Sequence, residues 1–151
     1  MKYAEARKSL ESVLSAWPRW DQLHYHLGLV YCELKMRTKA VKELKKAIAL
    51  GNTDREIAQF SFSLASLHQR QKKYALAAKY YSKALKHNPG DSVAWFKLGT
   101  IAEAMQKYRE ALRYYGKAIR LAKRRYARAY LRSAMVNVKL KNYLRAAMEL
   151  R

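Results

Sequence analysis

The stretch of sequence that decides the fold runs from Ser92 to Arg125 and reads SVAWFKLGTIAEAMQKYREALRYYGKAIRLAKRR. Its aromatic and alanine positions recur 34 residues earlier in the chain, where Tyr108, Ala111, Tyr115 and Ala118 are matched by Tyr74, Ala77, Tyr81 and Ala84. The pattern also recurs 35 residues later, where Trp95, Tyr108 and Ala111 are matched by Tyr130, Tyr143 and Ala146. A constant spacing in this range indicates a repeat array built from one recurring supersecondary unit.

The order of residues within each unit is specific. In the best example, Trp95-x2-Leu98-Gly99 is followed by Ala111-x3-Tyr115-x2-Ala118. This pattern resembles the tetratricopeptide repeat (TPR), and the resemblance covers residues 3–150. It implies an all-α fold, a right-handed α-solenoid of antiparallel helix pairs with about nine helices. An ordinary helical bundle would not repeat tyrosine and alanine at 34-residue spacing.

The repeat register predicts a single TPR domain over residues 1–151. A half repeat is followed by three repeats and a truncated repeat, with boundaries at 1–20, 21–57, 58–91, 92–126 and 127–151. The distance from Ala40 to Ala77 is 37 residues, which is longer than the other spacings. Three extra residues therefore lie in the loop between these units or lengthen the helix that follows it.

Local signals place several helix ends. The helical spacing of Tyr3, Ala6 and Leu10 predicts a helix over residues 2–16. Gly51-Asn52 predicts a helix end, with Thr53 or Asp54 as the next N-cap. Pro89-Gly90-Asp91 predicts a turn followed by another cap.

Both ends of the array are open in this register. The first helix lacks the helix that should precede it in its pair, and the chain stops at Arg151 within the last expected helix. Repeat arrays usually end in helices with a polar outer face. We therefore expect the chain to be a fragment of a longer protein and its open ends to pair with other copies in concentrated solution.

The composition is strongly basic, because 32 lysine and arginine residues against 11 aspartate and glutamate residues give a formal net charge of +21. Such a surface attracts polyanions, anionic membranes and acidic peptides, with strong salt dependence. Cys32 is a single cysteine, so no internal disulfide forms. The sequence has no apolar run of transmembrane length and no signal-peptide core. We expect a cytoplasmic protein that can associate with an anionic membrane surface.

The resemblance also implies a concave ligand groove lined by the first helix of each pair. It places Phe96 in this groove, with Tyr25, Phe62 and Leu131 at the equivalent positions. The next position holds His26, Ser63, Lys97 and Arg132, and one turn further come Leu29, Ser66, Thr100 and Met135. Arg128 lies at the start of the last of these helices. The predicted ligand groove comprises Tyr25, His26, Phe62, Phe96, Lys97, Arg128 and Arg132. An aromatic stripe is usually core, but here the register assigns the core to other positions.

Known TPR clamps fit this groove poorly. The clamp for the C-terminal carboxylate of chaperones uses lysine and asparagine in its first unit, where this sequence has Phe62 and Ser66. Only the third element keeps its charge, in Arg128 and Arg132. The TPRs of protein-modifying sugar transferases line their groove with asparagine at the position of His26. The equivalent positions of this sequence hold His26, Ser63, Lys97 and Arg132 instead. The resemblance therefore implies a groove without identifying its ligand.

A second candidate surface is an acid-free run of basic residues. The predicted basic patch comprises Arg113, Lys117, Arg120, Lys123, Arg124 and Arg125. The first three share one helix face because they are four and three residues apart. The plainer interpretation is a solvated face that keeps a scaffold soluble, but such faces normally mix charge signs. Arginine is suited to bidentate contact with phosphate or carboxylate, so the patch indicates anion binding.

The sequence predicts no catalytic site, cofactor or metal site. His24 and His26 are two residues apart on a helix and point in different directions, and Cys32 has no CxxC partner. The favoured function is a non-catalytic scaffold that binds an acidic protein segment or an anionic polymer, namely a glycan, a teichoic-acid-like polymer or nucleic acid. Two alternatives stay open. One is an accessory TPR domain of a bacterial glycosyltransferase or of a capsule or wall polymerase, and the other is a self-assembling module that uses its open ends.

Overall fold

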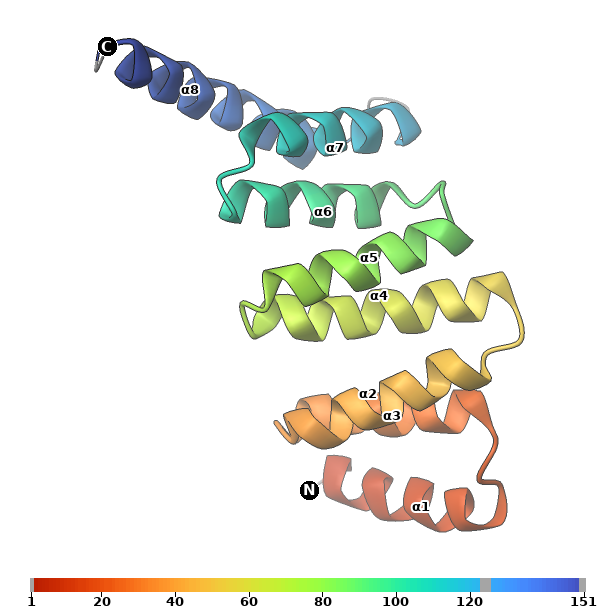
Figure 1. Ribbon diagram of the computed structural model, residues 1–151. Coiled ribbons are helices and arrows are strands. Elements are labelled where there is room, and N and C mark those ends of the chain that lie inside the picture. The colour runs from red at the N-terminus through yellow and green to blue at the C-terminus, as the bar shows by residue number, and fades with distance from the viewer. Residues whose placement is uncertain (1, 123–125, 150–151) are drawn as a thin grey trace. The chain divides into compact units, whose positions relative to one another are not determined.

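The computed structural model describes residues 2–122 and 126–149, with side chains through Lys141. The described residues form eight α-helices and no strand (Figure 1), which confirms the predicted all-helical repeat fold. The helices are α1 Lys2–Ala16, α2 Asp21–Glu33, α3 Arg37–Leu50, α4 Asp54–Arg70, α5 Tyr74–His87, α6 Ser92–Ala104, α7 Tyr108–Leu121 and α8 Ala127–Glu149.

The helices fall into two compact units. Unit 1 holds α1–α5 and ends at Asn88, and unit 2 begins at Pro89 and holds α6–α8. In unit 1, α2 packs on α3 and α4 packs on α5, while α1 contacts α2 and α3 contacts α4. In unit 2, α6 packs on α7, and α7 contacts α8. We call the first helix of each pair its A helix and the second its B helix. The A helices are α2, α4 and α6, and their B helices are α3, α5 and α7.

Side-chain caps fix two helix starts that the sequence predicts. Thr53 Oγ1 accepts a 3.2 Å hydrogen bond from the Glu56 amide, and Glu56 Oε2 accepts one of 3.1 Å from the Thr53 amide. This reciprocal capping box satisfies backbone donors at the start of α4 that have no helical partner. Asp91 Oδ1 accepts from the Val93 and Ala94 amides at 2.9 and 3.0 Å and caps α6 in the same way.

Small residues let the two helices of a pair approach closely. Ala40, Ala77 and Ala111 are fully buried at equivalent positions of the B helices. Gly28 of α2 lies against Leu44 of α3, where an added Cβ would stand 2.8 Å from the Leu44 Cγ. The helices join through tight turns in which Lys35, Lys72 and Gln106 each adopt a φ of 58–59°. A left-handed conformation costs a non-glycine residue about 1–2 kcal/mol, so the packing of each pair stabilises its turn.

The extra residues between Ala40 and Ala77 lengthen a helix rather than a loop. The helix that follows them, α4, has 17 residues, whereas α2 and α6 each have 13. The capping box at Thr53 starts α4 early enough for this additional turn.

The expectation of nine helices is wrong for the described residues, because α8 runs without a break from Ala127 to Glu149. Lys141 is the repeat equivalent of Gln106, which lies in the turn between α6 and α7, but Lys141 continues the helix. The side chains of Tyr143, Ala146 and Leu150, which continue the repeat pattern, lie outside the described residues.

None of the helices described in Figure 1 combines the length and the apolar character needed to cross a membrane.

Candidate functional site

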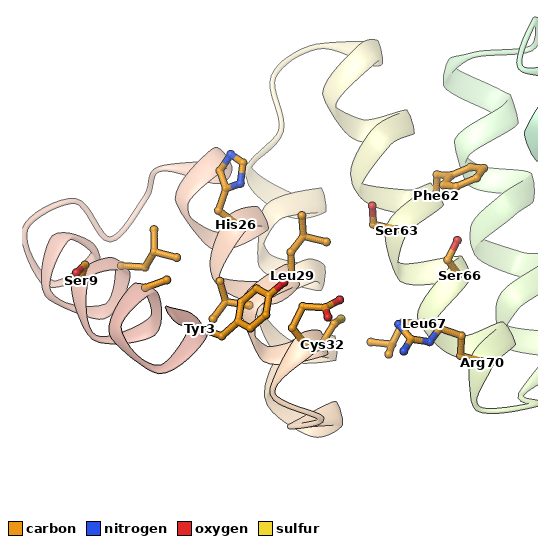
Figure 2. Close-up of a pocket in the computed structure, with 14 residues that line it drawn as sticks. Tyr3, Ser9, His26, Leu29, Cys32, Phe62, Ser63, Ser66, Leu67 and Arg70 are labelled. Atoms are coloured by element: carbon orange, nitrogen blue, oxygen red, sulfur yellow. The ribbon is translucent and has the colours of Figure 1, made fainter. Parts of the chain in front are cut away.

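Unit 1 contains a groove of about 760 Å³ between α1, α2 and α4 (Figure 2). Its walls come from Tyr3, Ala6, Ser9 and Leu10 of α1, from His26, Leu29, Val30, Cys32 and Glu33 of α2, and from Phe62, Ser63, Ser66, Leu67 and Arg70 of α4. In Figure 2, Leu29 and Cys32 lie on one side of the opening, and Ser63, Ser66 and Arg70 lie on the other.

The groove lining is largely apolar, and its two charged residues lie at one end. Leu67 belongs to the hydrophobic core of unit 1, and Leu10 and Leu29 pack against that core and line the groove with it. His26, Ser63 and Ser66 add polar groups partway along α2 and α4, whereas Glu33 and Arg70 lie at the C-terminal ends of these helices. Because Glu33 and Arg70 carry opposite charges, the groove has little net charge of its own. This arrangement suits an apolar side chain better than an anion.

Cys32 lies in the groove as a half-buried thiol. Burial raises the pKa of Cys32, and the nearby charge of Glu33 acts in the same direction, while Arg70 opposes them. The thiol is therefore protonated near neutral pH, which makes it a weak nucleophile.

Of the aromatic residues predicted in the groove, the structure places Phe62 in it and Tyr25 outside it. The Tyr25 ring packs on Phe60 with centroids 4.7 Å apart, and the side chain belongs to the core of unit 1. Its hydroxyl lies 3.3 Å from Ser63 Oγ. Side chains at successive helix positions point in different directions, so Tyr25 turns inward while His26 beside it is exposed. Tyr25 is thus a buried core residue that does not line the described groove.

Phe62 and Phe96 are both half-buried by aromatic neighbours. The Phe62 ring meets Tyr81 edge-on with centroids 5.1 Å apart. The Phe96 ring lies 5.5 Å from Tyr115 and 5.0 Å from Tyr126, measured between centroids. Phe96 therefore packs against the core of unit 2, and only Phe62 combines this packing with a place in the described groove.

Sequence reasoning missed the contribution of α1 to the groove. The repeat register matches Tyr3, Ala6 and Leu10 with core positions of the other B helices. In the structure these residues line the groove, and no A helix among the described residues covers them. The missing partner was visible in the register and is the signal that would have identified this wall.

In unit 2, Glu103 of α6 partly neutralises Arg132 of α8, one of the cations that the sequence predicted to line a ligand groove. Arg132 Nη1 lies 3.6 Å from Glu103 Oε1, and Lys139 Nζ donates to the same oxygen at 2.9 Å. Burial raises the pKa of Glu103, but the bonds from Lys139 and Tyr115 and the charge of Arg132 outweigh it and hold the pKa below its usual range. Arg128 is exposed, and Lys97 is half-buried.

The part of the basic patch that the structure describes forms a layer of cations on aromatic rings. Lys117 Nζ lies 4.0 Å from the centroid of the Trp95 ring, and the Arg113 guanidinium lies 5.6 Å from the centroid of Tyr114. The two rings stack with centroids 5.9 Å apart. Trp95 Nε1 donates to the Pro89 carbonyl at 2.9 Å, which fixes the indole.

Arg120 continues this face of α7 and is exposed. We call Arg113, Lys117 and Arg120 the α7 cationic face. Over the described ranges, 2–122 and 126–149, no carboxylate forms an ion pair with any of the three. Lys123, Arg124 and Arg125, the other predicted members of the patch, lie outside the described residues.

Comparisons with known proteins agree with this architecture. The chain matches the family model described as the tetratricopeptide repeat protein 21 C-terminal ARM domain over residues 2–148. A comparison with curated protein sequences gave no match.

Among solved structures, the chain is similar to a crystal structure of MamA, with a TM-score of 0.82 and 24% identity over 92% of this chain and 79% of that chain. It is similar to MamA 41-end from Desulfovibrio magneticus RS-1, with a TM-score of 0.80 and 18% identity over 98% and 81% of the two chains. It is also similar to YrrB, described as a TPR protein with an unusual peptide-binding site, with a TM-score of 0.76 and 19% identity over 93% and 71%. At these identities the likeness shows the fold.

The family match and the repeated helix pairs lead to the same conclusion. The chain belongs to the tetratricopeptide-repeat family described as the tetratricopeptide repeat protein 21 C-terminal ARM domain.

Proposed function

We propose that this chain is a non-catalytic interaction scaffold that binds an acidic protein segment through the α7 cationic face of unit 2. The observation that carries the proposal is the layer of Lys117 and Arg113 on the stacked rings of Trp95 and Tyr114. The rings hold the cations in place, so less side-chain entropy is lost when a carboxylate binds.

The same geometry favours carboxylates over nucleic-acid bases. Proteins that bind single-stranded nucleic acid offer aromatic faces on which bases stack. In unit 2, Lys117 covers the Trp95 ring, and Tyr114 stacks against it. The face therefore presents charge to a ligand, with its aromatic rings engaged within the protein.

The groove of unit 1 supports binding of protein segments by a different contact. Its apolar lining, which includes Leu10, Leu29 and Leu67, fits an aliphatic or aromatic side chain. The protein described as YrrB has a peptide-binding site on a similar fold, and we extend the same class of ligand to this chain. Each unit then offers its own contact to a protein segment, with the α7 cationic face of unit 2 selecting acidic residues and the groove of unit 1 accepting an apolar side chain.

The experiment is a salt series of binding to three labelled ligands, namely an acidic peptide with one leucine, single-stranded DNA and an anionic glycan. We expect the peptide to bind most tightly at about 0.15 M salt, with its preference retained as salt rises, because the leucine contact is not screened. Equal affinities that fall together with salt would indicate a general polyanion surface and would overturn the peptide assignment.

A further inference from the structure

Gly116 lies in the interior of α7 among the residues of the α7 cationic face, three residues after Arg113 and four before Arg120. Residues three and four apart are neighbours on a helix surface, so Gly116 lies between these two cations. Its backbone is helical, and no left-handed φ requires a glycine there. Glycine in a helix interior costs stability relative to alanine, so its place here needs another cause.

The packing of α7 within unit 2 does not supply that cause. A Cβ added at Gly116 would meet none of the described residues within 4 Å, whereas one at Gly28 or Gly99 would crowd a side chain of the paired helix. Gly28 and Gly99 therefore serve the contact within their own helix pairs. Gly116 instead leaves open space on the outside of its pair.

The position of Gly116 faces solvent even where a following helix pair is present. Its repeat equivalent in α3 is Lys45, which is exposed although α4 and α5 follow α3 in the same unit. The equivalent in α5 is Ser82, which is exposed as well. This repeat position therefore belongs to the outer surface of the B helices and not to the contact between successive pairs.

Positive charge alone does not distinguish α7 from the other B helices. At the positions of the α7 cationic face, α5 has Lys79, Lys83 and Lys86. What α7 adds is the glycine among its cations, together with arginine, which can bind a carboxylate through two parallel hydrogen bonds. This combination lets the backbone of a partner come close to α7 while its carboxylates reach the cations.

We propose, on the basis of the proposed function, that the acidic segment bound by the α7 cationic face is a helix that crosses α7 at Gly116. The distance between two packed helices depends on the side chains at their contact, and a glycine there lets the backbones approach closely. Carboxylates of the partner helix then reach Arg113 on one side of the crossing and Arg120 on the other.

The spacing of these two arginines fits a helix better than an extended segment. Arg113 and Arg120 are seven residues apart, which is about 10 Å along α7. Acidic residues seven apart on a partner helix share one face and have the same spacing of about 10 Å. In an extended segment, residues on one face are two or four apart, at about 7 or 13 Å, and match this distance less well. The interior of α7 also offers an extended segment no backbone hydrogen bonds, because its amides and carbonyls are paired within the helix.

The first test changes the space beside α7 and leaves its charge. The ligand is an alanine-based acidic peptide with glutamates seven residues apart, and its Kd is measured at about 0.15 M salt. We expect Gly116→Leu to weaken binding at least about tenfold, because the added side chain holds the two helices apart. Gly116→Ala should weaken binding by a smaller factor.

The matched control is Ser82→Leu, at the equivalent position of α5, which should leave the Kd unchanged. Thermal unfolding checks that the variants stay folded, which the open space beside Gly116 leads us to expect. Binding by both Gly116 variants as tight as by the unmodified chain, or an equal loss in Ser82→Leu, would overturn the proposal.

The second test changes the peptide and leaves the protein. An isomer of the same composition and charge carries its glutamates at alternate positions, so that they share one face only in an extended chain. We expect at least about tenfold tighter binding of the peptide with seven-residue spacing, because it places carboxylates at both arginines. Its helical circular dichroism signal should rise on binding, since short helices are marginal in water. Equal affinity for the two peptides, or no gain of helical signal, would show that the segment is not bound as a helix.

Charge reversal separates this proposal from the proposed function. If R113E/K117E/R120E loses binding while Gly116→Leu and the choice of peptide have no effect, the α7 cationic face binds an acidic segment that is not a helix. If the unmodified chain binds neither peptide, the proposed function fails, and the helical ligand fails with it.

Discussion

The Tyr115 hydroxyl of α7 donates a 3.0 Å hydrogen bond to Glu103 of α6, and the same carboxylate receives Lys139 and Arg132 of α8. Glu103 thus connects the three helices of unit 2. Its side chain is only 9% exposed. A carboxylate in this position is stabilised by its partners, and the partners in turn depend on it.

The first prediction concerns the loss of this carboxylate. Glu103→Ala leaves the buried Tyr115 hydroxyl without its acceptor and places two cations near each other. We expect the free energy of unfolding to fall by about 1–3 kcal/mol, as measured by urea denaturation. Glu103→Gln keeps an acceptor for Tyr115 and should cost less. Equal stability of the Ala variant and the unmodified chain would contradict the role of Glu103 as the link between α6, α7 and α8.

The second prediction compares two glycines of unit 2. A Cβ at Gly99 would overlap the Tyr115 ring, whereas a Cβ at Gly116 would meet nothing within 4 Å. Gly99→Ala should therefore destabilise the chain by about 1–3 kcal/mol through overpacking. Gly116→Ala should be neutral or stabilise it by up to about 1 kcal/mol, because alanine is the better helix former. Thermal unfolding of the two variants side by side checks this, and a similar change in both would count against the close α6–α7 packing.

The third prediction is a pH dependence of stability that arises from His68. The ring is buried, stacks on Tyr80 at 5.6 Å and has no hydrogen-bond partner among the described atoms. Burial lowers the pKa of His68, and the charges of Lys73 and Lys45 add to this effect. The folded state therefore resists protonation more than the unfolded state does. The contribution of the neutral His68 ring to the free energy of unfolding is fully present above the pKa of about 6.5 that histidine has in the unfolded chain. It is lost as the pH falls below that value.

The variant His68→Phe tests this dependence because it keeps the ring and removes the titration. As the pH is lowered from 7.5 to 5, the unmodified chain should lose stability that His68→Phe keeps. The free energy of unfolding of the variant minus that of the unmodified chain should therefore increase, as measured by urea denaturation at each pH. Other titrating groups are common to both chains and cancel in the difference. A difference that stays constant over this range would show that His68 does not titrate against folding.

The fourth prediction uses Cys32 as a reporter of the groove. Since burial raises the pKa of Cys32, less of the thiol is ionised and it should react with iodoacetamide several times more slowly than a free thiol at pH 7.5. A segment bound in the groove should slow the reaction further, because Cys32 lies in the wall. Unfolding in urea should restore the rate of a free thiol. Alkylation of the folded chain at the free-thiol rate would mean that the groove is more open than described.

Much of the fold could be predicted from residue spacing alone. The repeat register and cap signals predicted the helix over Lys2–Ala16, an N-cap at Thr53 or Asp54, which the structure places at Thr53, and an N-cap at Asp91. These features depend on residues close together in sequence, or on one unit copied several times. The fully buried alanines at equivalent positions of the B helices follow from the same repetition.

The candidate site could be predicted only in part, because it depends on contacts between helices. The register does not say that Tyr25 turns toward Phe60, or that Glu103 lies beside Arg132. Nor does it say that α8 continues past Lys141, since that outcome depends on whether a turn gains enough packing. Local pattern identified the surfaces, and the packing between helices decided which residues remain available on them.

The most direct test of the proposed function compares two variants of equal net charge. R113E/K117E/R120E reverses the α7 cationic face, and K42E/K79E/K86E reverses three exposed lysines of unit 1. Each change lowers the net charge by six, from +21 to +15. The measurement is the Kd for the leucine-containing acidic peptide at about 0.15 M salt. We predict at least about tenfold weaker binding for the α7 variant and a much smaller change for the control, because specific charge contacts outweigh the general field at this ionic strength. Equal weakening in both variants would contradict the assignment of the site to α7.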